Sequence, residues 1–198
     1  MPRLKIVQAG DPVLRQPAQP LSPDQIGSPE TRQLIEWMRE TMRDAPGVGL
    51  AAPQAGIPLQ IAVIEDLPQY SKDIPPEYLA DRERRPVAFH VLINPRIVTQ
   101  SDEQVEFFEG CLSVAGFSAL VKRSRQIVVE CWNESGEMQR IEASGWHARI
   151  LQHEIDHLCG RLYIDRMDTR SFTNMDNMSR FWKDLPIQAV RERLHGQV

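Results

Sequence analysis

The stretch QHEIDHLCG, residues 152–160, contains the residue types that hold a divalent metal ion and catalyse hydrolysis. His153 and His157 are four residues apart, which places both imidazoles on one face of a helix. Glu154 lies about 60° from His157 around that helix, within reach of a water beside the metal. The alternative is a chance occurrence of two histidines, because HExxH is a short pattern. The stretch therefore indicates a hydrolytic metal site but does not establish one.

A catalytic zinc-type site usually has three protein ligands, so a third ligand is required. The HExxHxxGxxH protease pattern has a third histidine, but Tyr163 occupies that position. Glu192 is the only glutamate of the tail, and Cys159 faces away from the histidines on the helix. Cys111 remains, because a thiolate with two imidazoles suits a borderline or soft metal. A free buried cysteine is the alternative for Cys111 when it is considered alone.

The segment GVGLAAPQAG, residues 47–56, is rich in glycine and alanine but is not a phosphate-binding loop. It lacks the lysine of GxxxxGK[ST] and does not fit GxGxxG. One interpretation is a turn into a buried strand. The other is a close approach of backbone to a ligand, with Gln54 supplying a carboxamide donor.

Composition limits the class of protein. The 198 residues suit one domain, with 41% hydrophobic residues, 25% charged residues and a net charge of -4. The sequence has no long basic run, so it lacks the charge pattern of a nucleic-acid-binding protein. No apolar stretch is long enough to span a bilayer. The sequence at the N-terminus has no secretory h-region. Three cysteines without a disulfide pattern favour a reducing compartment. We expect a cytoplasmic protein, with a mature mitochondrial or plastid form as the alternative.

The helices and strands that must position these residues give an α+β pattern. Helices are predicted at residues 28–47, where Ser28 is the N-cap, at residues 145–160, and in the tail at 186–194. Strands are predicted at residues 59–66, 91–99, 103–113, 126–132, 137–144 and 161–166. Gly136 lies in a hairpin turn, a further turn is expected near Pro95, and residues 66–90 read as a long surface loop. In the helix at 145–160, Leu151 and Ile155 belong to one apolar face, while Trp146 and Ile150 share a second face with the histidines.

Taken together, GVGLAAPQ, EGCLS and QHEIDH resemble the three motifs of the peptide deformylases, in the order of that family. The resemblance covers residues 1–170 as one catalytic domain, and residues 171–198 form a tail that is partly helical. The longer sequence around these motifs is most similar to the mitochondrial-type branch of the family. The implied fold is α+β, with a central HExxH helix surrounded by mixed or antiparallel sheets and with further helices towards both termini.

The resemblance implies an activity and roles for particular residues. It implies a hydrolase that removes the N-formyl group from N-formylmethionine on nascent polypeptides, at or near the ribosome. One divalent metal is implied, Fe²⁺ in the cell, with Zn²⁺, Ni²⁺ or Co²⁺ able to replace it. The residues that match functional positions of the family are the metal ligands Cys111, His153 and His157, the general base Glu154, the oxyanion donors Gln54 and the N–H of Leu112, the substrate-pairing Gly49, and the pocket residues Val48, Phe107, Trp146 and Ile150.

One position departs from the family. Bacterial members often carry an arginine seven residues after the metal cysteine, and Ser118 occupies that position here. Contacts to downstream substrate residues are therefore expected to differ. Two other functions fit the sequence less well: a zincin-type endopeptidase, and a non-enzymatic module that binds peptide N-termini. The second has no need for Glu154, since a structural metal site does not require a base.

Overall fold

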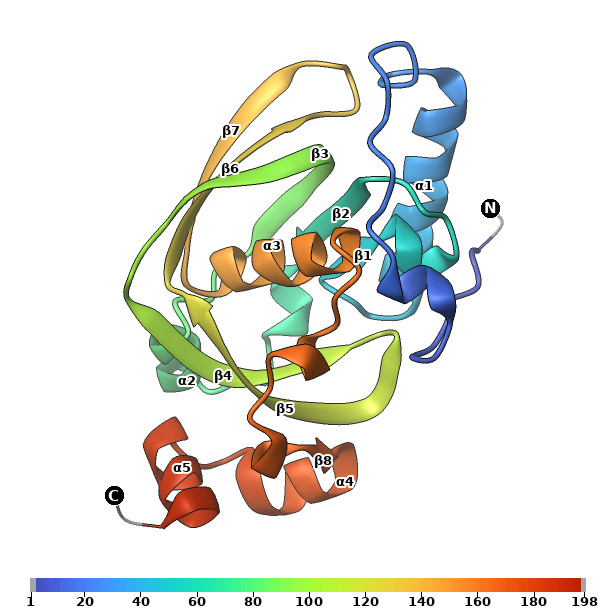
Figure 1. Cartoon of the computed structure of the whole chain (residues 1–198). Helices are drawn as coiled ribbons and strands as arrows, with labels where there is room; N and C mark the ends of the chain where they lie inside the picture. The colour runs from blue at the N-terminus through green and yellow to red at the C-terminus, as the bar shows by residue number, and fades with distance from the viewer. Residues whose placement is uncertain (1–2, 197–198) are drawn as a thin grey trace.

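The computed structural model describes residues 3–196 and consists of two antiparallel sheets with helices around and between them (Figure 1). The larger sheet has the strand order β1–β2–β3–β6–β7, and the smaller sheet has the order β4–β5–β8. The strands are β1 Gly49–Ala51, β2 Ile61–Asp66, β3 Val87–Gln100, β4 Gln104–Cys111, β5 Val114–Ser124, β6 Gln126–Trp132, β7 Met138–Ser144 and β8 Thr173–Asn174. The predicted α+β class is confirmed.

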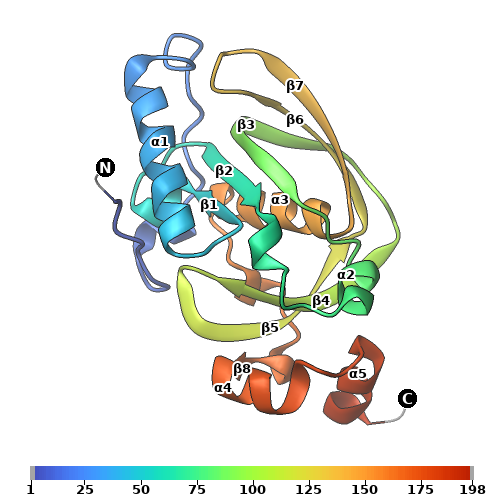
Figure 2. The ribbon, with the colours of Figure 1, turned by 180° about the vertical axis from the view of Figure 1, so that it is seen from behind.

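The larger sheet is covered on both faces. Helix α1, Pro29–Asp44, packs on one face, and Ser28 caps it as the sequence predicts (Figure 2). Helix α3, Gly145–Leu158, packs on the other face. Strand β2 is buried along its whole length because alternate side chains enter the two cores, Ile61 and Val63 on the α1 side and Ala62 and Ile64 on the α3 side.

Helix α3 also contacts the smaller sheet through β5, so it lies between the two sheets (Figure 1). The sequence predicts two covered faces for this helix. The helix is in fact buried on further sides, because Arg149 and Asp156 are 2% and 4% exposed. Both side chains are accommodated because they form ion pairs inside the protein, Arg149 with Glu109 and Asp156 with Arg123.

Three sequence predictions about strands and loops are wrong. No turn occurs at Pro95, because β3 continues through it. The register of β3 against β6 shifts between Ile93 and Arg96, and at such an irregularity a strand tolerates the backbone N–H that proline lacks. Residues 66–90 are not all loop, since helix α2, Pro76–Asp81, forms with proline at its first position. Residues 161–166 are not a strand. They form a 3₁₀ turn at Tyr163–Asp165, in which the Asp165 carboxylate accepts a hydrogen bond from the Leu162 N–H.

The tail packs against the smaller sheet below the body of the protein (Figure 1). After β8 come helix α4, Met175–Asn177, a π-helical turn at Met178–Trp182, and helix α5, Ile187–His195. Helix α5 confirms the helix that the sequence predicts in the tail. Between residues 3 and 196, every helix falls short of the length or hydropathy that crossing a membrane requires.

Candidate metal and catalytic site

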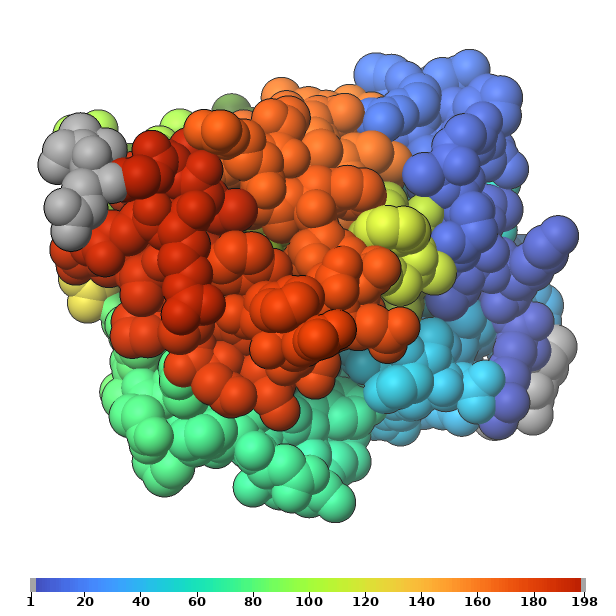
Figure 3. All heavy atoms as spheres, turned by 90° about the horizontal axis from the view of Figure 1, so that it is seen from below, coloured from blue at the N-terminus to red at the C-terminus, as the bar shows by residue number. Residues whose placement is uncertain are grey.

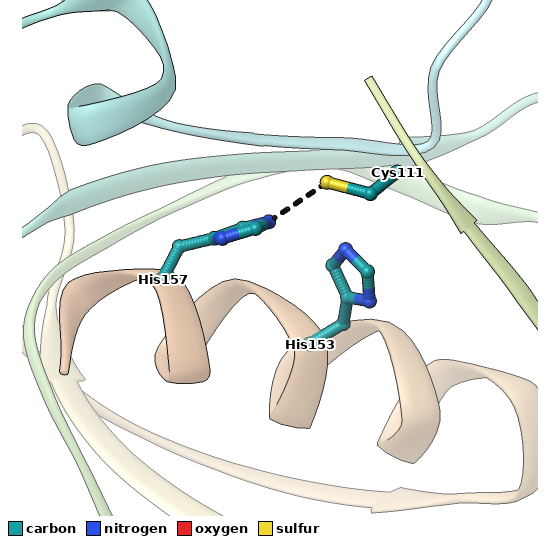
Figure 4. Close-up of side chains that lie close together, drawn as sticks. All are labelled: Cys111, His153 and His157. Atoms are coloured by element: carbon teal, nitrogen blue, oxygen red, sulfur yellow. Dashed lines mark hydrogen bonds between the residues drawn. The ribbon is translucent and has the colours of Figure 1, made fainter. Parts of the chain in front are cut away.

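Three side chains that can bind a metal converge between α3 and the end of β4. Cys111 Sγ, one ring nitrogen of His153 and one of His157 all lie within 4.8 Å of one another. Figure 4 shows both imidazoles rising from α3 towards the cysteine, with Cys111 Sγ 3.3 Å from His157 Nε2. One thiolate and two imidazoles form a donor set for a borderline or soft divalent ion.

The protonation states of the two histidines differ. Burial, with repulsion from His153 and Arg123, lowers the pKa of His157 well below the usual imidazole value. Burial alone would also lower the pKa of His153, but hydrogen bonds with Cys111 and Glu109 raise it well above that value. His157 is therefore favoured in the neutral form that a metal ligand requires, whereas a bound metal would have to displace a proton from His153.

Glu109 is a site residue that the sequence analysis missed. Its Oε2 lies 3.0 Å from His153 Nδ1, which leaves the Nε2 of that ring to face Cys111 and His157. Burial would raise the pKa of Glu109, but hydrogen bonds from His153 and Arg123 hold it well below the usual carboxyl value. The sequence contains a signal for this role: Glu109 lies two residues before Cys111 in β4, and so points to the same side of the strand.

A buried ionic network supports Glu109 in turn. Arg123 Nε and Nη2 donate to the two Glu109 oxygens at 3.0 and 2.9 Å, and Arg149 Nη1 donates to Oε1 at 2.6 Å. Arg123 also pairs with Asp156, which accepts two hydrogen bonds from Arg166. The network joins β4, β5 and α3, and it fixes the carboxylate that orients His153.

We predict that Glu109→Gln weakens metal binding by about 10–100-fold, as loss of a hydrogen bond to a ligating histidine does elsewhere. The amide preserves the shape of Glu109 but removes the charge that holds His153. Titration of Zn²⁺ into the folded protein measures the change. Glu130→Gln is the matched control, because Glu130 also pairs with two arginines but lies on the outside of β6. Equal affinities for the two variants would contradict the role of Glu109.

Glu154 lies beside the three candidate ligands and is 4% exposed. Its Oε2 has no hydrogen-bond partner among the described residues. Burial raises its pKa to about 7, close to the working pH of a general base or acid. The carboxylate packs against β1, where a Cβ on Gly49 would come within 2.3 Å of Glu154 Oε1. Only glycine at position 49 leaves room for this carboxylate.

Gln54 reaches the same place from the segment after β1. Its Oε1 accepts a hydrogen bond from the Ala51 N–H at 2.9 Å, and its Nε2 lies 3.4 Å from Cys111 Sγ and 3.3 Å from Ser113 Oγ. The carboxamide is thus held with its N–H groups towards the sulfur. Leu112 follows Cys111 directly, in the turn between β4 and β5.

A cavity of about 720 Å³ opens onto these groups and is lined mostly by apolar side chains. Val48, Trp146 and Ile150, which the sequence analysis assigns to a pocket, all line it. Phe107 does not. Its ring packs edge-on against Trp146 and lines a separate surface cavity, whereas the adjacent Phe108 lines the main one. Phe107 is therefore next to a residue of the lining, Trp146, and its own part in the pocket stays a prediction.

Sequence comparison finds the same family over most of the chain. Residues 3–172 match the family model of polypeptide deformylases. The chain is 47% identical over 184 residues to a chloroplastic peptide deformylase 1A of Solanum lycopersicum and 42% identical over 170 residues to the mitochondrial peptide deformylase of Homo sapiens. These matches cover 93% and 86% of the chain. The chain spans 65% of the length of the tomato protein and 70% of that of the human protein.

Solved structures agree with the sequence matches. A class I type b peptide deformylase from Acinetobacter baumannii, crystallised with Met-Ala-Ser bound, is 32% identical and superposes with a TM-score of 0.75. That comparison covers 84% of this chain and 99% of the other. The peptide deformylase of Thermotoga maritima is 36% identical, with a TM-score of 0.70. Because the family model matches residues 3–172 and relatives with 42–47% identity cover most of the chain, the chain belongs to the polypeptide deformylase family.

Proposed function

We propose that this protein is a metal-dependent hydrolase that removes the N-formyl group from N-formylmethionine at the start of nascent polypeptides and releases formate. The observation that carries the proposal is the meeting of Cys111, His153 and His157 beside the buried Glu154 carboxylate, at the wall of an apolar cavity. A buried carboxyl group whose Oε2 has no hydrogen-bond partner within residues 3–196, next to a possible metal-binding donor set, is expected at a catalytic centre rather than at a structural metal site.

Cys111, His153 and His157 would hold one divalent ion, and we propose Fe²⁺, with Zn²⁺, Ni²⁺ or Co²⁺ able to replace it. Their donor atoms lie close enough to share one ion, and Glu109 orients one imidazole. When bound, such an ion would polarise the formyl carbonyl as a Lewis acid and make water a better nucleophile.

Residues of the chain itself would transfer the proton, stabilise the developing charge and bind the peptide. Glu154 accepts the proton of the attacking water and returns it to the leaving amine. Gln54 and the Leu112 N–H donate to the formyl oxygen, where negative charge develops in the transition state. The backbone of Gly49 pairs with the peptide. The orientation of the Gln54 amide beside Cys111 supports the proposed role of Gln54 as a donor to the formyl oxygen.

The architecture around the site supports a single catalytic unit over residues 1–170, with α3 as its central helix, and a tail over residues 171–198. The packing of α3 against strands of both sheets favours this division. The partners would be N-formylmethionyl peptides at or near the ribosome. We propose the cytoplasm as the location, with an organelle as the alternative that the names of the tomato and human relatives support.

Turnover of a formyl-Met peptide is the experiment that tests the function. Release of formate from formyl-Met-Ala-Ser by the metal-loaded protein is expected, with no cleavage of internal bonds in the same peptide. A zincin-type endopeptidase would instead cut unformylated peptides internally. Absence of formate release from any formyl peptide, with metal bound, would reject the proposal.

We predict that formyl-Met and formyl-norleucine peptides turn over at least tenfold better than formyl-Gly or formyl-Asp peptides. Val48, Trp146 and Ile150 make an apolar wall next to the candidate ligands, and such a wall suits an unbranched, flexible side chain. Each methylene buried or lost is worth about 1–3 kcal/mol in such pockets. Ile150→Ala should flatten the ranking and Val48→Trp should block it. The measurement is kcat/KM for each peptide, and a formyl-Met to formyl-Gly ratio below ten would contradict the pocket.

A further inference from the structure

An exposed apolar surface continues the cavity beyond the candidate pocket. Phe117 and Met175 line the same cavity as His153 and Glu154, at 41% and 52% exposure. Phe172, 41% exposed, stacks on Phe117. Among residues 3–196, five large apolar side chains are this exposed, and three of them gather here. Clustered exposed apolar groups mark a binding surface more often than scattered ones do.

The tail holds this surface in place. Strand β8 pairs with β5 in the register Phe117↔Asn174 and Ser118↔Thr173, which places Met175 directly after a paired residue. The Phe117 and Phe172 rings lie nearly parallel at 6°, with their centroids 4.9 Å apart. The Asn174 side chain caps α4 by accepting from the Asn177 N–H at 2.8 Å. Met175 is therefore presented at the cavity by a fixed backbone.

A second contact fixes the tail further along. Phe108 and Leu120 of the smaller sheet form an apolar cluster with Val190 of α5, and Trp182 packs against it. Seen from below, the orange and red atoms of the tail adjoin the yellow-green atoms of the turn between β4 and β5 (Figure 3). The family model of the deformylases ends at residue 172, so Met175 lies beyond it and outside the segment that carries the three motifs.

A peptide whose first side chain lies near Trp146 and Ile150 has to leave the cavity past other lining residues. The volume of about 720 Å³ falls in the range of cavities that take drug-sized ligands, which are comparable in size to a short peptide. An extended chain advances about 3.4 Å per residue, so its second and third side chains reach beyond the pocket. Apart from the pocket residues, the large apolar side chains of the lining are Phe108, Leu112, Phe117 and Met175, and of these Phe117 and Met175 are the exposed ones.

We propose that Met175, together with the stacked Phe117–Phe172 pair, forms an apolar subsite for the second or third side chain of the formylated peptide. The tail thereby selects substrates by the sequence that follows the methionine, in favour of apolar side chains over acidic ones. This inference rests on the proposed function and adds a determinant that lies outside the three motifs.

Charge substitution at position 175 tests the subsite. The substrates are formyl-Met-Leu-Phe and formyl-Met-Asp-Asp, and the readout is the ratio of their kcat/KM values within each variant, so that a general loss of activity cancels. The native ratio is expected to favour the apolar peptide about tenfold or more, the lower end of the effect of an apolar contact in a substrate pocket. Met175→Lys should lower the ratio by about tenfold, and Met175→Glu should raise it.

Phe181→Lys is the matched control, because Phe181 belongs to the same tail and is 45% exposed but does not line the cavity. It should keep the native ratio. If Met175→Lys and Met175→Glu also keep the native ratio while formyl peptides are turned over, the tail does not contact the substrate and the inference is wrong. If Phe181→Lys shifts the ratio as much as Met175→Lys, the effect comes from the net charge of the tail and the subsite is again rejected. Absence of turnover for every formyl peptide would instead remove the proposed function.

Discussion

Replacing Glu154 with glutamine should lower kcat by about 10²–10⁴-fold while the protein keeps its metal. The side chain is 4% exposed and its Oε2 has no hydrogen-bond partner within residues 3–196, so no structural contact requires the charge of the carboxylate. Glutamine has the same shape and fits the space that Gly49 leaves. It cannot accept a proton from water, and the proposed general base is therefore lost while the candidate ligands Cys111, His153 and His157 stay in place.

The measurements are single-turnover or steady-state formate release and metal content per chain. Glu142→Gln serves as the control, because the side chain of Glu142 is 77% exposed on β7, on the surface of the larger sheet. It should leave both quantities at the native values. A Glu154→Gln protein with full metal content and unchanged kcat would rule out the role of Glu154. A loss of metal as well as activity would place the carboxylate among the ligands instead.

The part of the site that lies on one element was readily predicted from the sequence. His153, Glu154 and His157 belong to one helix, and the spacing of residues along a helix fixes their relative directions. Cys111 lies 46 residues before His157, and no local pattern relates the two. The pairing of β4 with β5 and the packing of α3 against β5 bring them together. Elimination of other ligands and family resemblance indicated Cys111, but periodicity did not.

The buried charges were the least predictable part. A helical wheel places Arg149 and Asp156 between two apolar faces and gives no reason to bury them. Their burial depends on partners in other strands, Glu109 in β4 and Arg123 in β5, which only the three-dimensional fold provides. For Phe107, resemblance located the strand, but the cavity that its side chain lines depends on how β4 packs, and its part in the pocket stays a prediction.

The tail shows the same division between local and non-local information. The apolar spacing of residues 186–194 predicts a helix, and α5 forms there. The position of that helix depends on Val190 packing against Phe108 and Leu120, and on the two-residue strand β8. A strand of two residues has no recognisable sequence pattern. The contribution of Met175 to the cavity could therefore be found only from the structure.

Replacing Cys111 with alanine should remove most of the bound metal, from one ion per chain to a small fraction of that value. Two imidazoles alone are fewer ligands than catalytic or structural zinc-type sites use, and a thiolate is the softest donor of the three. Cys111 is half-buried and alanine fits its position, so the fold should persist and the loss should be specific to the metal. Metal content after dialysis against Zn²⁺ or Ni²⁺, with circular dichroism to verify folding, measures the effect.

Cys159→Ala is the control. Cys159 is exposed at the end of α3, so this variant should keep its bound ion. Full retention of metal by the folded Cys111→Ala protein would exclude the cysteine from the site and, with it, the mixed thiolate and imidazole centre on which the proposed chemistry depends.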